Sequence, residues 1–440
     1  MANHHPPQRE RWAWYLYDFG NSAYAAVVLL AVYAAYFKGQ VVGGARGSWL
    51  WGLSVGIAMF VVAVTSPVLG AIADFSGSKK RFLLFFTSMA CTFTGLLFFA
   101  RQGTVFIGML FFILAEIGYR SAQVFYNSLL PEVSTPEDIG RVSGTGWAIG
   151  SAGGILCLLI ILPLIMFIEG TLIVRASLLI TALFFAGFAI PIFRRLEERT
   201  DPQPLPDGAS YLTIGFKRLW ETIKRIKHFR EFAKFVIAFL IYNDGIMMAL
   251  NFAGIIGAVL FGMDQQQLII FMIVAQVTSI GGAFFAGLIA DWIGTKRSLL
   301  LHLLLMISVV TWMFFVQTLT QFFLIGALAG FALTGVQSVS RTAVASFSPS
   351  NRNAEFYGFF AIAGRTSSFI GPTVYGWIAA WAANFYMQRG QGALLAEQNG
   401  QRLAILSINL FLLVGLIFLL AVNEKKAMRA ASSPPEEIAA

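Results

Sequence analysis

The side chains that could do chemistry in this chain of 440 residues are a few charged groups inside long apolar stretches. They are Asp18, Glu116, Arg120, Asp244 and Arg365. A charge in membrane hydrocarbon is costly unless it is paired or reaches water, so such groups mark binding sites and proton pathways. Glu116 and Arg120 are four residues apart, which places them on one face of a helix. We therefore look for function at these positions.

Two kinds of chemistry suit these charges. The first is binding of a small zwitterion, with Arg120 and Arg365 holding its carboxylate and Asp18 or Asp244 its ammonium group. The second is carriage of a coupling proton, because burial favours a neutral carboxyl group and a nearby arginine favours a charged one. The structural alternative is that Glu116 and Arg120 only neutralise each other and that Asp18 caps or packs a helix. The amides that complete the predicted substrate or proton site are Asn21, Gln123 and Gln337.

A short loop motif occurs once in each half of the chain. Residues 70–81 read Gly-Ala-Ile-Ala-Asp-Phe-Ser-Gly-Ser-Lys-Lys-Arg, and residues 287–297 read Gly-Leu-Ile-Ala-Asp-Trp-Ile-Gly-Thr-Lys-Arg, at an offset of 217. The glycine permits a tight turn, and the cations are typical of a cytoplasmic loop. We expect a conformational latch here; positive loops that happen to contain an acid are the alternative. The expected latch residues are Gly70, Asp74, Gly77, Arg81, Arg141, Asp291, Gly294 and Arg297.

The composition indicates an integral membrane protein. Hydrophobic residues make up 57% of the chain and charged residues only 12%, which is more apolar than a soluble core requires. The net charge of +9 therefore reflects positive loops beside anionic lipid rather than nucleic-acid binding. Cys91 and Cys157 are the only cysteines and lie in apolar runs, so we expect no disulfide framework, metal site or cofactor. A phosphate-binding glycine loop and a polar catalytic cluster are absent from the sequence, so we do not expect an enzyme.

The apolar stretches predict an all-α membrane protein with twelve transmembrane helices. Domain boundaries are expected as residues 1–193 for an N-terminal six-helix bundle, 194–231 for a cytoplasmic linker with an amphipathic helix, 232–423 for a C-terminal six-helix bundle and 424–440 for a disordered tail. The excess of Lys and Arg on one side predicts that both termini are cytoplasmic. The spans are expected at Trp12–Phe37, Trp49–Ala73, Phe82–Ala100, Val105–Leu130, Val142–Phe167, Leu172–Phe193, Phe232–Phe261, Leu268–Ala290, Ser298–Val316, Phe322–Ser346, Phe356–Ala380 and Leu403–Val422.

Several stretches resemble a known family. The loop at residues 70–81 is similar to the signature loop of the major facilitator superfamily, and Gln123 and Gln337 repeat at an offset of 214. Residues 17–24, 130–132, 140–150, 355–359 and 371–372 resemble its vacuole effluxer-like branch, which includes autophagy-related amino-acid effluxers of fungal vacuoles and bacterial members. This chain has Gly20 where the branch has alanine, and Arg365 where lysine is common. The resemblance implies two pseudo-symmetric six-helix bundles, the major facilitator fold.

We therefore expect a secondary active transporter of a small solute that works by rocker-switch alternating access. The first hypothesis is export of amino acids or similar zwitterions through the inner membrane, proton-coupled, by a monomer in contact with membrane lipid. The second is transport of peptides, sugars, siderophores or drugs. A different class of function, a transport-inactive nutrient sensor or a lipid scramblase, is the remaining alternative.

Overall fold

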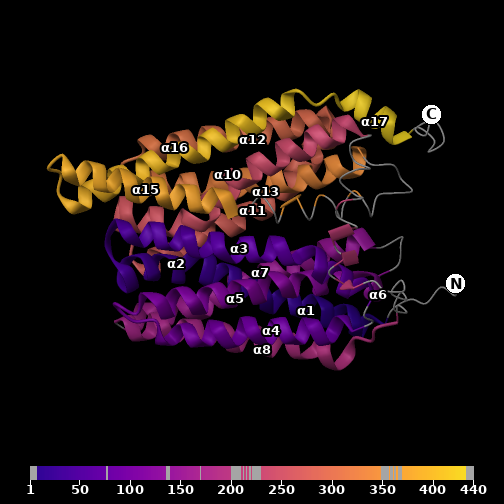
Figure 1. Cartoon of the computed structure of the whole chain (residues 1–440), viewed down its shortest axis with the longest axis horizontal. Coiled ribbons are helices and arrows are strands. Elements are labelled where there is room, and N and C mark those ends of the chain that lie inside the picture. The colour runs from indigo at the N-terminus through magenta and orange to yellow at the C-terminus, as the bar shows by residue number, and fades with distance from the viewer. Residues whose placement is uncertain are drawn as a thin grey trace. The chain divides into compact units, whose positions relative to one another are not determined.

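The computed structural model of the chain describes residues 7–75, 78–134, 139–168, 170–199, 229–347 and 369–432. Outside these ranges it describes only the single positions 210, 211, 213, 214, 216, 217, 220, 356, 360, 363 and 364. The regular structure of this part of the chain is helical (Figure 1). Contacts divide the chain into a first unit of Met1–Phe216 with Met263–Ile270, and a second unit of Lys217–Gly262 with Phe271–Ala440.

The first unit is built from long helices that are joined by short turns. The predicted boundaries hold to within a few residues, because uninterrupted apolar sequence needs a helix to satisfy its backbone inside a membrane. The helices after the first crossing are α3 (Gly44–Phe75), α4 (Lys79–Leu96) with the 3₁₀ turn η3 (Leu97–Phe99), α5 (Val105–Ser128), α6 (Leu130–Val133), α7 (Ile139–Phe167) and α8 (Thr171–Arg195).

The first membrane crossing differs from a plain helix. It consists of α1 (Gln8–Tyr24), the π-helix η1 (Ala25–Ala31), α2 (Tyr33–Tyr36) and a second π-helix, η2 (Phe37–Val42). Each π segment widens the helix, and such segments are frequent at functional sites. Two hydroxyls hold this crossing in place, since Tyr33 donates to the carbonyl of Gly108 and Tyr36 to that of Ala100.

The second unit contains the remaining helices, except that the first residues of α11 belong to the first unit. They are α10 (Arg230–Phe261), α11 (Gln265–Ile293), α12 (Thr295–Phe315), α13 (Leu319–Phe347), α15 (Ile370–Gln388), α16 (Ala393–Leu420) and α17 (Glu424–Ser432). The disordered tail expected from residue 424 is wrong for Glu424–Ser432, which form α17 and pack on α13 and α10. The predicted interfacial helix of the linker lies outside the described residues apart from single positions.

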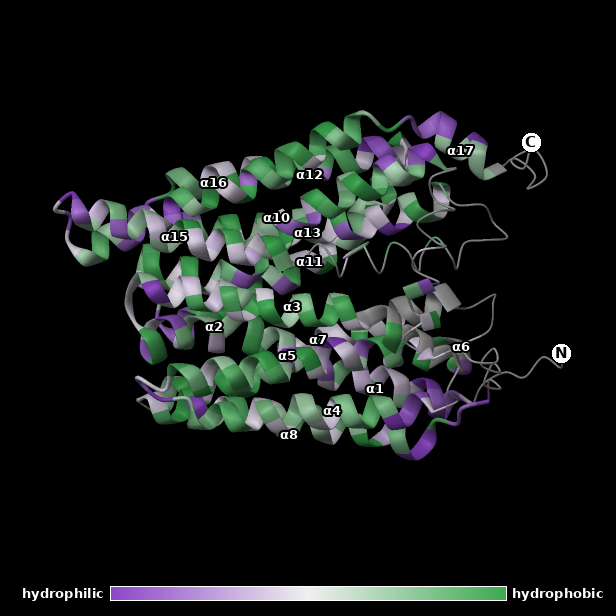
Figure 2. Cartoon of the chain, in the orientation of Figure 1, coloured by the Kyte–Doolittle hydropathy of each residue, from purple (hydrophilic) through white to green (hydrophobic). Residues whose placement is uncertain are grey.

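The helices have the length and composition of membrane spans. Within the described residues, eleven helices are long and apolar enough to cross a bilayer. The predicted span Phe356–Ala380 is described only in part, and α15 covers its second portion. Figure 2 shows α4, α5 and α8 as apolar along most of their length, with polar residues gathered where α8 ends and α4 begins.

Close backbone contacts place α1 between α7 and α8. A Cβ added at Gly153 of α7 would lie 2.1 Å from the carbonyl oxygen of Phe19. A Cβ added at Gly20 would lie 2.9 Å from the Cβ of Phe188 and 3.1 Å from the carbonyl oxygen of Phe185. Small residues are the usual means of such approach between membrane helices. The glycine at position 20, which departs from the family pattern, is therefore needed by the packing of α8 in this chain.

Candidate functional site

The ion pair predicted on the fourth apolar stretch forms within α5. Nε of Arg120 donates to Oε1 of Glu116 over 2.8 Å. The glutamate side chain is fully buried, whereas 26% of the arginine side chain is exposed. The second carboxylate oxygen, Oε2, has no hydrogen-bond partner in the described part of the chain. Since buried charged oxygens are normally satisfied, the pair leaves one acceptor open to a proton, a water molecule or a ligand.

Two tyrosines, which the sequence analysis did not single out, enclose this pair. The ring of Tyr24, the last residue of α1, stacks on that of Tyr119 with a centroid distance of 4.5 Å. The guanidinium carbon of Arg120 lies 5.3 Å from the centre of the Tyr119 ring, which suits a cation–π contact. The Tyr24 hydroxyl interacts with Glu116 and Arg120, although it forms no hydrogen bond of regular geometry with a described residue.

Asp18 lies on α1 and packs against α7. A Cβ added at Gly150 would be 2.6 Å from Oδ2 of Asp18 and 3.0 Å from Oγ of Ser22. The aspartate side chain is half-buried, and it is in electrostatic range of Tyr119 on α5. The absence of a side chain at Gly150 therefore makes the space in which this carboxylate lies.

Two predicted amides lie in the same unit. Asn21 of α1 is buried, and its Nδ2 has no hydrogen-bond partner among the described residues. Gln123 of α5 is half-buried and interacts with Tyr119. The first unit thus contains, on α1 and α5, five of the residues predicted to bind substrate or a proton, namely Asp18, Asn21, Glu116, Arg120 and Gln123.

Asp244 of the second unit lies at a helix terminus. It is a buried residue of α10, and its Oδ1 accepts a hydrogen bond from the backbone nitrogen of Gly371 over 3.0 Å. Gly371 is the second residue of α15, where backbone N–H groups lack partners within the helix, and Pro372 has none to offer. A carboxylate here is also stabilised by the helix dipole. The contact supports a capping role, and the substrate or proton role of Asp244 stays a prediction.

Of the two other residues predicted to bind substrate, the structure describes only one. Gln337 is half-buried on α13. Arg365 lies outside the described residues, so its role as a carboxylate-binding cation stays a prediction.

Only some residues of the predicted latch are among those that the structure describes. Arg81 and Arg297 are exposed, and Gly294 adopts a φ of 91° just before α12, a conformation that favours glycine. Gly77 lies outside the described residues, as do the side chains of Gly70, Asp74, Arg141 and Asp291. The latch therefore stays a prediction.

Next to the predicted latch, two glutamates that the sequence analysis missed cap helices in corresponding places. Glu198, just after α8, accepts hydrogen bonds from the backbone nitrogens of Lys80 over 2.6 Å and Lys79 over 3.0 Å, in the first turn of α4. Glu424, at the start of α17, accepts one from the backbone nitrogen of Lys296 over 3.1 Å, in the first turn of α12. Each acid lies a few residues after a long apolar stretch, which is the signal in the sequence.

Glu132, from one of the family motifs, is part of a cluster of charges in the first unit. It accepts a hydrogen bond from the backbone nitrogen of Arg199 over 3.0 Å and pairs with Nζ of Lys79 at 3.6 Å. The guanidinium of Arg199 donates to both oxygens of the buried Glu10. These hydrogen bonds raise the pKa of Arg199 above its ordinary value, because they stabilise its charged form. The cluster therefore ties the starts of α1 and α4 to α6 and to the segment that follows α8.

The whole chain resembles solved transporters of the major facilitator type. It aligns with a bacterial homologue of the human lysosomal transporter Spinster at a TM-score of 0.72 and 14% identity, covering 97% of this chain and 98% of the other. It aligns with the nucleoside transporter NupG at a TM-score of 0.67 and 14% identity, covering 94% and 98%. These likenesses show the fold alone. Together with the membrane-spanning helices and the transporter relatives, they define a multi-pass membrane transporter of the major facilitator class, as predicted.

Within that class, the chain belongs to the vacuole effluxer Atg22-like family, whose model matches residues 51–432. An uncharacterized MFS-type transporter of Bacillus subtilis, YxiO, is 28% identical over 426 residues, which are 94% of this chain and 94% of that protein. Autophagy-related protein 22 of Yarrowia lipolytica is 24% identical over 417 residues, covering 75% of this chain and 70% of that protein. The family membership predicted from the motifs is confirmed.

Proposed function

We propose that this transporter exports a small zwitterion, such as an amino acid, by alternating access. The observation that carries the proposal is the incomplete ion pair of Glu116 and Arg120, which lies in a membrane-spanning helix. The carboxylate of Asp18, on α1 of the same unit, is in electrostatic range of Tyr119, as the ion pair is. Opposite charges close together in the membrane suit a ligand that also carries both charges. The export direction rests on the family, which is described as vacuole effluxers.

Arg120 is the residue that we propose to bind the substrate carboxylate. A guanidinium has five N–H donors, and Nε is the one that bonds to Glu116. The remaining donors can form the two parallel hydrogen bonds that a carboxylate accepts from arginine. Because about a quarter of the Arg120 side chain is exposed while Glu116 is fully buried, a ligand can reach the arginine without displacing the glutamate.

Asp18 is the residue that we propose to meet the substrate amine or to carry a coupling proton. No ion pair joins it to another side chain in the described part of the chain. An ammonium group or a proton would each compensate its charge, and both would leave when the site opens to water. Asn21, whose side chain interacts with Asp18 in the same turn of α1 and forms no hydrogen bond of regular geometry through its amide nitrogen, would orient the ligand. Arg365 is the proposed second cation for the carboxylate.

The cellular setting that we propose follows the distribution of charge. The positive loops favour a plasma-membrane protein, the inner membrane in a bacterium, with both termini in the cytoplasm. A single chain supplies both halves of a major facilitator, so we propose a monomer.

The proposal is tested by ligand-dependent melting of the purified protein. Amino acids, dipeptides, sugars and common drugs are compared, and a ligand at 100 times its dissociation constant should stabilise by about 2.7 kcal/mol. Arg120→Lys keeps a cation beside Glu116 but loses the planar fork. We expect a stabilising amino acid to need a higher concentration in this variant and to act normally on Arg389→Lys, a control at the exposed end of α15.

The outcomes separate the functions. Stabilisation by amino acids, weakened in Arg120→Lys alone, supports the proposal and leads to flux assays in liposomes. Stabilisation only by a larger solute would contradict the proposed zwitterion and would indicate that the protein transports peptides, sugars, siderophores or drugs. A ligand that binds but shows no flux would indicate a sensor, and lipid flip-flop without solute flux would indicate a scramblase.

A further inference from the structure

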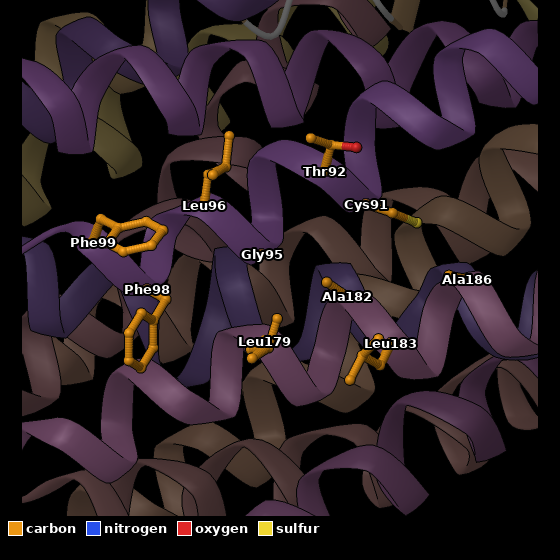
Figure 3. Close-up of a pocket in the computed structure, with 10 residues that line it drawn as sticks. All are labelled: Cys91, Thr92, Gly95, Leu96, Phe98, Phe99, Leu179, Ala182, Leu183 and Ala186. Carbon is orange, nitrogen blue, oxygen red and sulfur yellow. The ribbon is translucent and has the colours of Figure 1, made fainter.

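A groove in the first unit lies between α4 and α8 and is lined by none of the residues that we propose to bind the solute. It has a volume of about 550 Å³ and is lined almost entirely by apolar side chains. Figure 3 shows Phe98 and Phe99 at one end of the groove and Cys91 and Ala186 at the other. Gly95 contributes to its lining, since an added Cβ would meet only Leu179 at 3.5 Å and Ala182 at 3.7 Å.

The residues around this groove indicate that its ligand is a hydrocarbon chain. Both α4 and α8 have the length and composition of membrane spans. The side chains at the rim are exposed, with Leu183 at 65% and Phe99 at 52%. In a membrane such a surface faces lipid, and a groove of this kind is filled most favourably by an acyl chain, because an empty apolar void forfeits its packing contacts.

Two arginines give one end of the groove a positive charge. Arg175 of α8 donates to the carbonyl of Phe98 over 3.2 Å, and its guanidinium carbon lies 5.2 Å from the centre of the Phe98 ring. Arg101, two residues beyond Phe99, is exposed. Both arginines are in electrostatic range of Tyr36, so they lie near each other. Within the described residues no carboxylate forms an ion pair with either arginine.

We propose that this groove is a binding site for an anionic phospholipid. One acyl chain lies along Gly95 and Ala182, and the phosphate lies at Arg101, with the buried Arg175 adding positive charge behind it. The inference does not depend on the identity of the transported solute.

Native mass spectrometry of the full-length protein, titrated with phosphatidylglycerol or phosphatidylethanolamine, tests the acyl-chain site. Gly95→Leu keeps an ordinary Cβ contact and fills the groove with the rest of its side chain. Gly187→Leu is the matched control, because an added Cβ on this residue of α8 meets nothing within 4 Å. We expect Gly95→Leu to lose one tightly bound phosphatidylglycerol that the wild type and Gly187→Leu retain. Equal lipid binding by the two variants would overturn the proposal.

A second pair of variants tests the headgroup. Arg101→Gln should weaken phosphatidylglycerol binding about five-fold, the effect of one cation near an anionic headgroup. It should weaken phosphatidylethanolamine binding less, because the ammonium group of that lipid offsets the charge of its phosphate. Arg46→Gln is the control, as an exposed arginine at the start of α3. An unchanged preference for phosphatidylglycerol in Arg101→Gln would refute the placement of the phosphate. If Gly95→Leu does not fold, Leu183→Trp at the exposed rim fills the groove instead.

Discussion

Removing the charge of Arg120 should destabilise the protein more than removing the charge of Glu116, although both changes break the same ion pair. In Arg120→Gln the carboxylate of Glu116 stays fully buried and loses its cation, a change that costs about 3–5 kcal/mol for a buried pair. In Glu116→Gln the cation that remains is 26% exposed and lies over the ring of Tyr119. Because it keeps part of its hydration, the cost should be nearer the ~1–3 kcal/mol of an unsatisfied polar group.

The order of melting temperatures of the purified variants tests this reasoning. The double variant Glu116→Gln/Arg120→Gln contains no buried charge at the site, so it should melt closer to Glu116→Gln than to Arg120→Gln. Lys425→Gln, an exposed change of charge on α17, should melt like the wild type. Equal losses in the two single variants, or a double variant that loses their sum, would show that burial of the carboxylate does not control the stability of the pair.

Three further predictions concern packing, capping and transport. Gly20→Ala should lower stability by about 1–3 kcal/mol through overpacking against α8, whereas Gly187→Ala, which meets nothing within 4 Å, should gain up to about 1 kcal/mol of helix propensity; a reversed order of melting temperatures would contradict the contact. Glu424→Ala should cost about 0.5–2 kcal/mol and speed hydrogen exchange in the first turn of α12, and unchanged exchange there would exclude the cap. Asp18→Asn and Arg365→Ala should abolish flux in liposomes without lowering the melting temperature, and full transport by both would remove these residues from the mechanism.

The sequence predicted the helical fold well because the membrane imposes length and polarity on each span. The exception at α16 is instructive, since this helix begins at Ala393 and not near the predicted Leu403. Polar residues lower the hydropathy of its first turns, but they have partners: Gln401 accepts from the hydroxyl of Tyr375 over 2.8 Å, and Gln398 donates to the carbonyl of Val259 over 3.2 Å. Such long-range contacts leave no periodic signal.

The site was predictable where it depends on local spacing. Glu116 and Arg120 lie four residues apart on one helix, so their contact follows from helical geometry. The stacking of Tyr24 on Tyr119 depends on how α1 and α5 meet. The π segments after Tyr24 also arise from tertiary packing, because the sequence Ala-Ala-Val-Val-Leu-Leu-Ala is equally suited to an α-helix.

The duplication of the chain helps to separate scaffold from site. Tyr17 and Tyr242 are both fully buried and donate to or accept from a hydroxyl, of Thr87 and Ser340 respectively. Gly20 and Gly245 follow them at the same interval, and each packs against the last long helix of its own unit, α8 or α16. These contacts occur in both halves, together with the capping glutamates, so they belong to the scaffold.

The ion pair of α5 has no such counterpart. At the repeat offset of 214, Glu116 and Arg120 correspond to Gly330 and Thr334 of α13. Gly330 packs closely on α11, where an added Cβ would lie 2.2 Å from the carbonyl oxygen of Ala275, and Thr334 donates to the carbonyl of Gly330. A charged pair is therefore not required to build this helix in the fold. Since a fully buried carboxylate with an open oxygen is costly to keep, its presence in one half alone supports our proposal that Arg120 binds the ligand.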